Sequence, residues 1–468
     1  MEKKEFGLVG LGVMGKSLSR NLAGKGYKLA LFNRHITGKE EDVAIQFVSA
    51  FPELEQSQGF DDLKAFVQSL DRPRKIFLMV NAGAATDAVI EDLIPLLDQG
   101  DIIMDGGNSF YKDTQRRMER LAELGLHFLG CGVSGGEKGA LEGPSIMPGG
   151  AQAAYGMVQP YLESIAAKDN NAQPCCTYIG NGGAGHFVKM VHNGIEYAEM
   201  QLIAEVYFIL RQGMGYSPDA IAAIFEQWLK TDAASYLLEI TVDILRVREG
   251  TGWLLDEVLD AASNKGTGGW ATAAAAELGV PATMISEALF ARYLSAFVKE
   301  RSTAAQGFVN AHTTFTQDTD HLRDAYQLAR IINHHQGIHL IDAASTTYHW
   351  GLNLPELARV WTNGCIIRSV LMEQLIAALK DTNRLLLYPN LGQKAQNFKQ
   401  NLSETVINAL TAGLEIPCLS VALNFLNGYT NIHSPMNIIQ AQRDYFGAHT
   451  YMRRDSGSTE TGGFISPK

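Results

Sequence analysis

The sequence predicts an α/β domain with a doubly wound, mostly parallel sheet, followed by a large all-α domain and a short C-terminal tail. Short apolar runs alternate with helical segments through the first 180 residues, whereas long amphipathic segments dominate after residue 183. A chain of 468 residues is also too long for one ordinary hydrophobic core. We therefore expect domains at residues 1–183 and 184–434, and a tail at residues 435–468.

The apolar runs of the first domain have the length and composition of buried strands. Helical spacing appears between them, as in the segment DTQRRMERLAELG at residues 113–125. Parallel strands need such crossovers, so the alternation favours a parallel sheet. We expect strands at residues 6–10, 27–32, 75–80, 101–105 and 127–133.

The second domain contains long amphipathic segments and almost no strand signal. Its apolar residues recur with the period of a helix, which predicts helices that pack on one another. We expect helices at residues 184–211, 217–230, 283–301, 321–335 and 369–380.

Composition excludes several functional classes. The formal net charge of −11 disfavours nucleic acid and anionic membranes as partners, although a few local cations suffice for a small anionic substrate. The five cysteines form no CxxC motif, which favours reduced thiols over disulfides or a zinc site. The sequence has no signal-peptide pattern at its start and no apolar run of transmembrane length. We expect a cytoplasmic protein.

The segment GLGVMG carries Gly10, Gly12 and Gly15 in the order GxGxxG. It directly follows the first predicted strand and opens a helical segment, which is the context of a dinucleotide site. Glycines there allow a tight turn and a close approach of the pyrophosphate to the helix N-terminus. The motif therefore predicts a dinucleotide-binding site, and the alternative is an ordinary strand–helix turn.

The end of the second predicted strand indicates the cofactor. Sites that prefer NAD usually place Asp or Glu here, against the ribose 2′-hydroxyl. This chain has Asn33 and Arg34 instead, and a guanidinium suits a 2′-phosphate. The sequence therefore favours NADP over NAD, unless Arg34 is only an exposed surface residue.

Two further segments follow predicted strands, at the edge of the sheet where ligands bind. The segment DGGNSF contains Asn108, and the glycine-rich segment after residue 131 contains Ser134, Gly135 and Gly136. A hydroxyl and bare backbone N–H groups can cradle a carboxylate or a hydroxyl. A glycine-rich segment is also often only a turn.

The helix predicted from residue 184 gathers four polar side chains on one stripe. A rotation of about 100° per residue brings Lys189, His192, Asn193 and Glu196 to neighbouring directions, over about 10 Å of helix. The alternative is a solvated face. Histidine and asparagine are poor helix formers, and a glycine-rich hinge precedes the helix, so we favour a functional site.

Other cations are ordinary surface residues when taken singly, but together they suggest a phosphate clamp. They are Lys265, Arg292, Arg443 and His449. The histidines of the segment HHQGIH include an i,i+4 pair without a carboxylate at metalloprotease spacing, so we interpret them as structural and expect no metal site. These histidines are His334, His335 and His339.

Taken together, these motifs resemble the family of decarboxylating 6-phosphogluconate dehydrogenases. The resemblance covers residues 5 to 451, and the segments KMVHNGIEY and RDYFGAH are highly specific to that family. It implies a Rossmann-type domain, an all-α domain, NADP, a homodimer and oxidative decarboxylation of 6-phosphogluconate in the pentose phosphate pathway. The alternatives are a shorter type of β-hydroxyacid dehydrogenase, which lacks the IEY carboxylate, and a catalytically inactive nucleotide-binding protein.

The resemblance also implies a role for each matching residue. Lys189 is expected to be the general base and Glu196 the general acid. Arg443 and His449 are expected to reach the site of the other subunit. The sugar acid is expected on Asn108, Ser134, Gly135, Gly136, His192 and Asn193, and its phosphate on Tyr197, Lys265 and Arg292. The cofactor is expected on Gly10, Leu11, Gly12, Val13, Met14, Gly15, Asn33, Arg34, His35, Val80, Asn81, Ala82 and Asn108.

The chain departs from the family pattern at three positions. Asn81 stands where a lysine is usual, and His35 stands where a threonine is common. Both positions lie near the expected 2′-phosphate, so they bear on the preference between NADP and NAD. Lys138 replaces a second glutamate in the glycine-rich segment.

Overall fold

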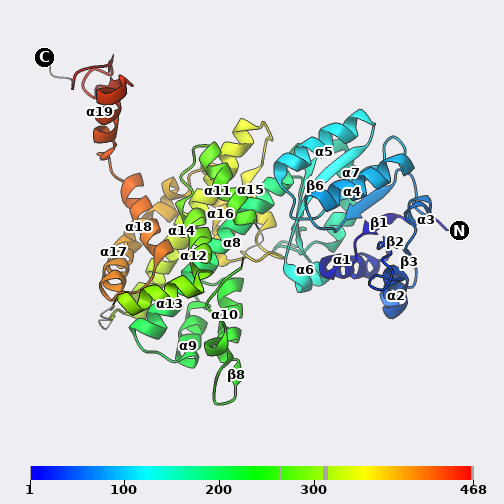
Figure 1. Cartoon of the computed structure of the whole chain (residues 1–468), viewed down its shortest axis with the longest axis horizontal. Helices are drawn as coiled ribbons and strands as arrows, with labels where there is room; N and C mark the ends of the chain where they lie inside the picture. Colours follow the sequence, from blue (N-terminus) through cyan, green and yellow to red (C-terminus); the bar gives the residue numbers. More distant parts are fainter. Residues whose placement is uncertain (1, 264–265, 309–314, 465–468) are drawn as a thin grey trace. The chain divides into compact units, whose positions relative to one another are not determined.

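A seven-stranded sheet forms the N-terminal part of the protein (Figure 1). The computed structural model describes residues 2–263, 266–308 and 315–464. The strand order is β3-β2-β1-β4-β5-β6-β7, and all neighbours are parallel except β6 and β7. The predicted fold class is confirmed. The strands are β1 (Phe6–Val9), β2 (Leu29–Phe32), β3 (Gln58–Phe60), β4 (Lys75–Leu78), β5 (Ile102–Asp105), β6 (His127–Ser134) and β7 (Ser145–Gly150).

Helices cover both faces of this sheet. Alternate strand residues point to opposite faces, so Phe6 and Leu8 belong to one core cluster while Val9 belongs to the other. The helices of this part are α1 (Val13–Gly24), α2 (Val43–Ala50), η1 (Pro52–Leu54), α3 (Leu63–Gln68), α4 (Ala84–Leu93), η2 (Ile94–Leu96), α5 (Tyr111–Glu123), α6 (Gly136–Glu142) and α7 (Gln152–Ile165).

After α7 the chain becomes almost entirely helical. The first helix of this part, α8, packs against β6 and β7 at its start and against α14 and α11 along its length. The further elements are α8 (Ala184–Phe208), η3 (Ile209–Gly213), α9 (Pro218–Trp228), α10 (Tyr236–Arg246), β8 (Arg248–Glu249), β9 (Gly252–Trp253), η4 (Leu254–Glu257), α11 (Thr267–Glu277), α12 (Thr283–Ser295), α13 (Val298–Gly307), α14 (Thr319–Thr347), α15 (Leu354–Val360), α16 (Val370–Asp381), η5 (Leu385–Leu387), α17 (Pro389–Thr411) and α18 (Pro417–Tyr429).

Helix α8 lies unusually close to the sheet. A Cβ atom at Gly132 of β6 would stand 2.5 Å from the Cβ atom of Lys189. Only glycine allows this approach, because real Cβ atoms do not come so near to each other. The small residue of the strand therefore sets the position of a polar residue of α8 relative to the carboxyl end of the sheet.

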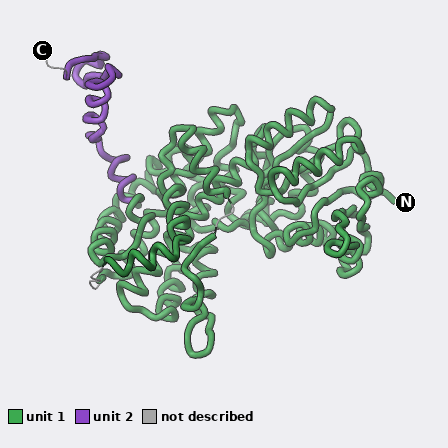
Figure 2. The backbone as a smooth tube through the Cα atoms, viewed as in Figure 1, with its two compact units in different colours: residues 1–422 green, residues 423–468 purple. Residues whose placement is uncertain are grey.

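The chain divides into two compact units, residues 1–422 and 423–468 (Figure 2). The second unit contains the end of α18, helix α19 (Met436–Gly447), and the antiparallel strands β10 (Tyr451–Met452) and β11 (Thr459–Glu460). The domain boundaries expected at residues 183 and 434 stay predictions. No helix within the described ranges is both long enough and apolar enough to cross a membrane.

Candidate active site

A cavity of about 420 Å³ opens at the carboxyl end of the sheet, between the sheet and α8. Ligands bind at this edge in doubly wound folds. Its walls come from segments far apart in the sequence. The lining residues are Met14, Asn108, Val133, Ser134, Gly135, Gly136, Lys189, Asn193, Glu196, Tyr197, Met200, Ser263, Thr267, Arg292 and Ile366.

Helix α8 contributes an amine, an amide and a carboxylate to the cavity. Lys189, Asn193 and Glu196 lie on successive turns and all line its wall. Asn193 is buried, and its Nδ2 donates a hydrogen bond to Thr267 Oγ1 over 3.3 Å. This bond fixes Asn193 against the first turn of α11. The side chain of Glu196 stays 20% exposed.

The Lys189 amine is almost completely withdrawn from water, with 7% of the residue exposed. Burial lowers the pKa of Lys189 from its ordinary value, because the charged form loses its hydration. The nearby Glu196 carboxylate opposes this effect. A lysine with a depressed pKa can act as a proton acceptor, which an exposed lysine near neutral pH cannot do efficiently.

His192 lies behind the cavity wall and does not line it. Its Nε2 is 3.3 Å from Ser134 Oγ, its Nδ1 is 3.3 Å from Asn193 Oδ1, and its ring packs edge-on against Trp361. Burial and the Lys189 charge lower the pKa of His192 well below its ordinary value, so the imidazole is neutral. In this position it contacts two lining residues, Ser134 and Asn193, and its Nδ1 lies 3.7 Å from Oε2 of a third, Glu196.

The end of β6 and the segments after β5 and β6 add a second set of lining residues, Asn108, Ser134, Gly135 and Gly136. Ser134 is buried at the end of β6, whereas Asn108 is exposed. Gly136 begins α6 and has open space where a Cβ atom would stand. These residues therefore offer a hydroxyl, an amide and accessible backbone N–H groups to a ligand.

One end of the cavity presents an unusual cation. The Arg292 guanidinium lies 3.6 Å from the centroid of the Tyr197 ring, and its Nη1 donates to the carbonyl oxygen of Ser263 over 3.3 Å. Burial lowers the pKa of Arg292. The Tyr197 hydroxyl and the Glu196 carboxylate oppose this effect. A partly buried guanidinium with free donors on a cavity wall suits an anionic ligand group such as a phosphate.

The GxGxxG segment fits a dinucleotide. A Cβ atom at Gly10 would lie 2.5 Å from the carbonyl oxygen of Met79, and one at Gly15 would lie 2.0 Å from the carbonyl oxygen of Gly10. These two glycines let β1, β4 and α1 pack closely. Gly12 precedes α1, is exposed, and has open space around the missing Cβ atom. That space at a helix N-terminus suits a pyrophosphate.

The end of β2 carries the residues expected at the 2′-phosphate. Arg34 is exposed and forms a two-point ion pair with Glu40, with Nε–Oε2 and Nη2–Oε1 distances of 3.2 Å each. Asn33 Nδ2 donates to the same carboxylate over 3.1 Å, and Asn33 Oδ1 accepts from the backbone N–H of Leu11. His35 Nδ1 lies 4.0 Å from Asp61 Oδ2.

Comparison with known proteins identifies the family. Residues 5–180 match the model of the NAD binding domain of 6-phosphogluconate dehydrogenase, and residues 185–464 match that of its C-terminal domain. The chain belongs to the 6-phosphogluconate dehydrogenase family. The sequence resemblance is thereby confirmed.

Individual members of the 6-phosphogluconate dehydrogenase family match along nearly their whole length. The decarboxylating 6-phosphogluconate dehydrogenase of Lactococcus lactis is 44% identical, and the match covers 97% of each chain. The NADP(+)-dependent decarboxylating enzyme of Bacillus subtilis is also 44% identical, over 97% of this chain and 98% of its own. The structure of Plasmodium falciparum 6-phosphogluconate dehydrogenase aligns with a TM-score of 0.93 at 36% identity, over 98% of this chain and 100% of its own.

The other residues expected from the family pattern belong to the cofactor segments, to the second compact unit or to the part of the chain outside the described residues. Lys265 lies outside the described residues. Arg443 and His449 are exposed residues of the second compact unit. Val13, Asn81 and Ala82 are exposed, and Met14 lines the cavity, so the cofactor segments of this 6-phosphogluconate dehydrogenase family member are accessible.

Several lining residues of this family member were not predicted from the sequence. Met200 continues the stripe of Lys189, Asn193 and Glu196 by one turn, so helical spacing alone was sufficient to find it. Ile366 lies in an apolar segment without a chemical signal, and only the tertiary fold brings it to the cavity. Thr267 follows the predicted phosphate residue Lys265 in the sequence, and it binds Asn193.

The histidines of the segment HHQGIH are largely buried in α14. His334 Nδ1 donates to the carbonyl oxygen of Arg330 over 2.9 Å, and the rings of His335 and His339 are 6.3 Å apart. Among the described residues of this family member, no group of three or more His, Cys, Asp or Glu side chains is arranged to hold a metal ion.

Proposed function

We propose that this protein catalyses the oxidative decarboxylation of 6-phosphogluconate to ribulose 5-phosphate and CO2, with NADP as the oxidant. One observation carries the proposal. A buried amine and a carboxylate from one helix line a cavity that also contains a desolvated guanidinium. The relatives that share the whole chain are named as decarboxylating 6-phosphogluconate dehydrogenases, which supports the same activity.

NADP, when bound at the carboxyl end of the sheet, supplies the oxidising group that takes a hydride from C3 of the sugar acid. Neutral Lys189 accepts the proton of the C3 hydroxyl in this step, and its depressed pKa makes the neutral form available. The product is a β-keto acid, whose C3 ketone accepts the electron pair released when the bond between C2 and the carboxylate carbon C1 breaks. Protonated Lys189 then donates a hydrogen bond to the C3 oxygen and stabilises the developing enolate.

The enediol left after loss of CO2 must gain a proton at the carbon that becomes C1 of ribulose 5-phosphate. Glu196 is the proposed donor, because it lies on the same wall of the cavity two turns further along α8. Arg292 and Tyr197 hold the phosphate, and Asn108, Ser134 and Asn193 hold hydroxyl and carboxylate groups of the sugar acid. Lys265 completes the phosphate site in the family pattern.

The decisive experiment is a spectrophotometric assay of NADPH formation with 6-phosphogluconate, with CO2 release measured in parallel. We expect equal amounts of NADPH and CO2, and a higher kcat/KM for NADP than for NAD. Oxidation without CO2 release would contradict decarboxylation, and the absence of turnover with either cofactor would contradict the proposed activity. Oxidation of a shorter β-hydroxyacid in preference to 6-phosphogluconate would favour the alternative class of dehydrogenase.

We further propose a cytoplasmic homodimer in which Arg443 and His449 of the partner subunit complete each site. Exposed apolar residues of the second unit support association, because Ile432 is 90% exposed and Phe446 is 73% exposed. The five cysteines are free and buried, which is usual in a reducing compartment.

A hybrid-dimer experiment tests the shared site. Lys189→Ala and Arg443→Ala homodimers should each be nearly inactive. After joint refolding, mixed dimers contain one site with both residues intact, so activity should return. No recovery in mixtures that sedimentation shows to be dimeric would contradict a site shared between subunits.

A further inference from the structure

The segment that carries Asn108 is held by a buried carboxylate. Asp105, the last residue of β5, is fully buried. Its Oδ1 accepts a hydrogen bond from the backbone N–H of Gly107 over 2.9 Å, and its Oδ2 accepts one from Ser109 Oγ over 2.6 Å. Both neighbours of Asn108 are therefore bound to one side chain. The exposed Asn108 is the middle residue of a three-residue loop with two anchored ends.

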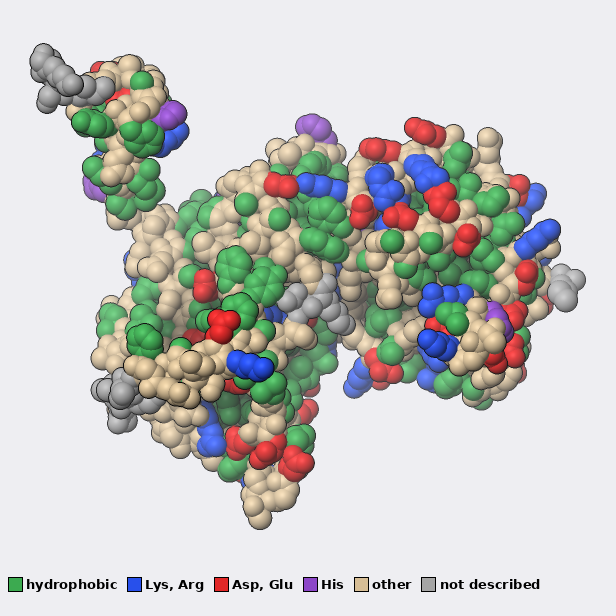
Figure 3. Space-filling view, in the orientation of Figure 1, with side chains coloured by type: hydrophobic (Ala, Val, Ile, Leu, Met, Phe, Trp, Pro, Cys, Tyr) green, Lys and Arg blue, Asp and Glu red, His purple; other side chains and the backbone are tan. Residues whose placement is uncertain are grey.

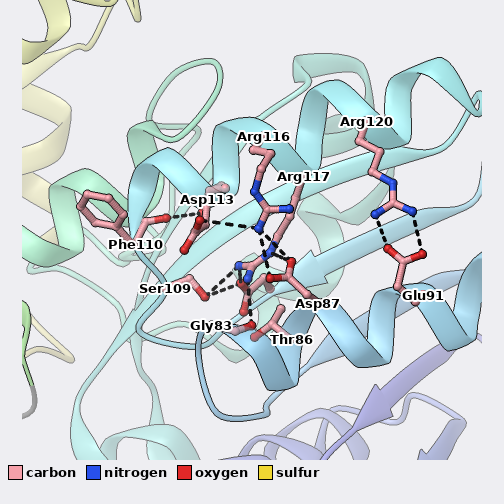
Figure 4. A network of polar contacts seen from close by, with 12 residues as sticks. Gly83, Thr86, Asp87, Glu91, Ser109, Phe110, Asp113, Arg116, Arg117 and Arg120 are labelled. Carbon is pink, nitrogen blue, oxygen red and sulfur yellow. Dashed lines mark hydrogen bonds and ion pairs between the residues drawn. The ribbon is translucent and has the colours of Figure 1, made fainter.

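A buried arginine, Arg117, connects the Asn108 loop with the loop that follows β4. The Arg117 side chain of α5 is 2% exposed, and its Nη1 lies 3.4 Å from both Asp105 Oδ2 and Ser109 Oγ (Figure 4). Its Nε donates to Asp87 Oδ1 over 2.8 Å, and its Nη2 donates to the carbonyl oxygen of Gly83 over 3.0 Å. Gly83 ends the segment after β4 that contains Val80, Asn81 and Ala82.

The same carboxylate residue also reaches helix α8. His186 Nε2 donates to the carbonyl oxygen of Asp105 over 3.1 Å, and Thr114 Oγ1 of α5 lies 2.6 Å from His186 Nδ1. His186 precedes Lys189 by one turn. The loop of Asn108 is therefore connected on one side to Arg117 and on the other to the helix of the proposed base.

We propose that Arg117 is a positioning residue that fixes the Asn108 loop and the 80–83 loop relative to each other. A buried ion pair is weak evidence for a stabilising role, because the cost of dehydrating both charges can exceed their attraction. A planar guanidinium can instead bind several acceptors at fixed angles. Arg117 uses this property to join two loops that come from neighbouring strands.

The proposal rests on the proposed function, and it adds a consequence for binding. Asn108 is an exposed lining residue of the substrate cavity, and residues 80–82 of the 80–83 loop belong to the expected cofactor segments. A change at Arg117 should therefore weaken binding of the sugar acid and of NADP together. A residue needed only for folding would lower the amount of active enzyme and leave both KM values unchanged.

A matched control exists on the same pair of helices. Arg120 of α5 pairs with Glu91 of α4 one turn further along, and both side chains are about half exposed (Figure 4). Figure 3 shows cations and carboxylates gathered over the outer face of α5 and α4. Arg120→Gln thus removes an α4–α5 ion pair without touching either loop.

The test compares Ser109→Ala, Arg117→Gln and Arg117→Lys with Arg120→Gln in steady-state assays with 6-phosphogluconate and NADP. We expect Arg117→Gln to raise both KM values by about tenfold and to lower kcat/KM by up to about 100-fold, since small displacements of substrate-positioning groups have such effects. Arg117→Lys keeps the positive charge but loses the planar guanidinium, so we expect its KM values to lie between those of Arg117→Gln and those of the unchanged protein. Arg120→Gln should stay within about twofold of the unchanged protein.

Ser109→Ala removes one hydroxyl and keeps the proposal testable if the Arg117 variants do not fold. It should raise the KM for 6-phosphogluconate several-fold with little change in Tm. KM values equal to those of Arg120→Gln in both the Ser109 and the Arg117 variants would overturn the proposal. If the unchanged protein does not turn over 6-phosphogluconate, the proposed function fails instead, and calorimetric binding of NADP to the same variants still tests the connection to the 80–83 loop.

Discussion

Lys189 and Glu196 lie seven residues apart on α8, and both side chains line the same cavity. Seven residues correspond to nearly two full turns and to about 10 Å along a helix axis. One rigid element therefore sets the separation of the two groups that we propose for proton transfer. Because α8 packs against β6, β7, α11 and α14, a substitution at one position leaves the other in place.

Substitution of Lys189 should abolish the oxidative step. Lys189→Met retains an apolar chain of similar length but cannot accept a proton, so kcat should fall by about 100-fold or more. Lys138→Met is the control, because Lys138 is an exposed lysine of α6. The rate of NADPH formation is measured for both variants. Turnover of Lys189→Met at the rate of the unchanged protein would refute the assignment of the base.

The pH dependence should report the same amine. Lys189 must be neutral to accept a proton, and burial lowers its pKa below the ordinary value of 10.5. The value of kcat/KM should therefore decrease as the pH falls through this depressed pKa, and it should level off above it. A pH profile measures the midpoint. A profile whose acid limb lies at or above pH 10.5 would contradict a desolvated base.

Glu196 should act after oxidation. Glu196→Gln cannot donate a proton, so formation of ribulose 5-phosphate from the enediol should slow by about 100-fold or more. Exchange of hydrogen at C1 of ribulose 5-phosphate in D2O, followed by NMR, isolates this step. Glu137→Gln, which changes an exposed carboxylate of α6, is the control. Unchanged exchange in Glu196→Gln would assign the proton donor to another group.

Glu40 should weaken the preference for NADP. Its carboxylate forms a two-point ion pair with Arg34 and would compete with the 2′-phosphate of NADP for the guanidinium. Glu40→Gln should lower the KM for NADP about three- to fivefold, which is the size of effect that an exposed pair supports. The KM for NAD, which has no 2′-phosphate, should change less. Arg34→Ala should instead narrow the difference in kcat/KM between NADP and NAD.

The control for this prediction is Glu53→Gln. Glu53 pairs with Arg20 over 2.6 Å in the same part of the chain, and both side chains are partly exposed. The Glu53→Gln variant should leave the ratio of kcat/KM values for NADP and NAD unchanged. If Glu40→Gln gives the same ratio as Glu53→Gln, the ion pair does not influence cofactor choice.

The sequence was sufficient to predict five of the seven strands, because each is an apolar run long enough to show its character. Strands β3 and β7 were missed for different reasons. The segment of β3 has only three residues, Gln58–Phe60, and that of β7 contains a proline and two glycines that are typical of turns. Strand β7 lies at the end of the sheet and pairs with β6, with Pro148 opposite Cys131.

In the helical part, two predicted helices differ in extent from those of the structure. Segment 283–301 forms two helices, because the chain breaks at Ala296 and Phe297. Helix α14 extends over 29 residues, well beyond the predicted 321–335, and buries Arg330 and Asn333 among other polar groups. Polar side chains that bind partners inside the protein obscure hydrophobic periodicity, so the length of such a helix is underestimated from its sequence.

The candidate site could be predicted where one helix or one loop carries it. Lys189, Asn193 and Glu196 come together through helix geometry alone. The ion pair of Arg34 with Glu40 and the four contacts of Arg117 depend on loops and on neighbouring elements, so composition and spacing give no signal for them. His192 illustrates the intermediate case, because its direction on the helix was predicted but its contact with Trp361 was not.

Glu205 joins α8 to α18 and should make stability depend on pH. Its two carboxyl oxygens accept hydrogen bonds from the backbone N–H groups of Cys418, over 2.7 Å, and Leu419, over 2.8 Å. Burial raises the pKa of Glu205 from 4.5 to about 8. A carboxyl group whose pKa rises on folding stabilises the folded state at pH values below its unfolded pKa, and this contribution disappears as the pH rises through the folded pKa.

The loss should therefore occur between pH 4.5 and about 8, where the buried carboxyl keeps a proton that the unfolded chain has released. It should amount to a few kcal/mol, since each tenfold difference in proton affinity corresponds to about 1.4 kcal/mol. Glu205→Gln stays neutral throughout, so its Tm should vary less over this range in calorimetric scans. Glu249→Gln, at an exposed position, should keep the slope of the unchanged protein. Parallel curves for all three proteins would mean that Glu205 does not titrate in this range.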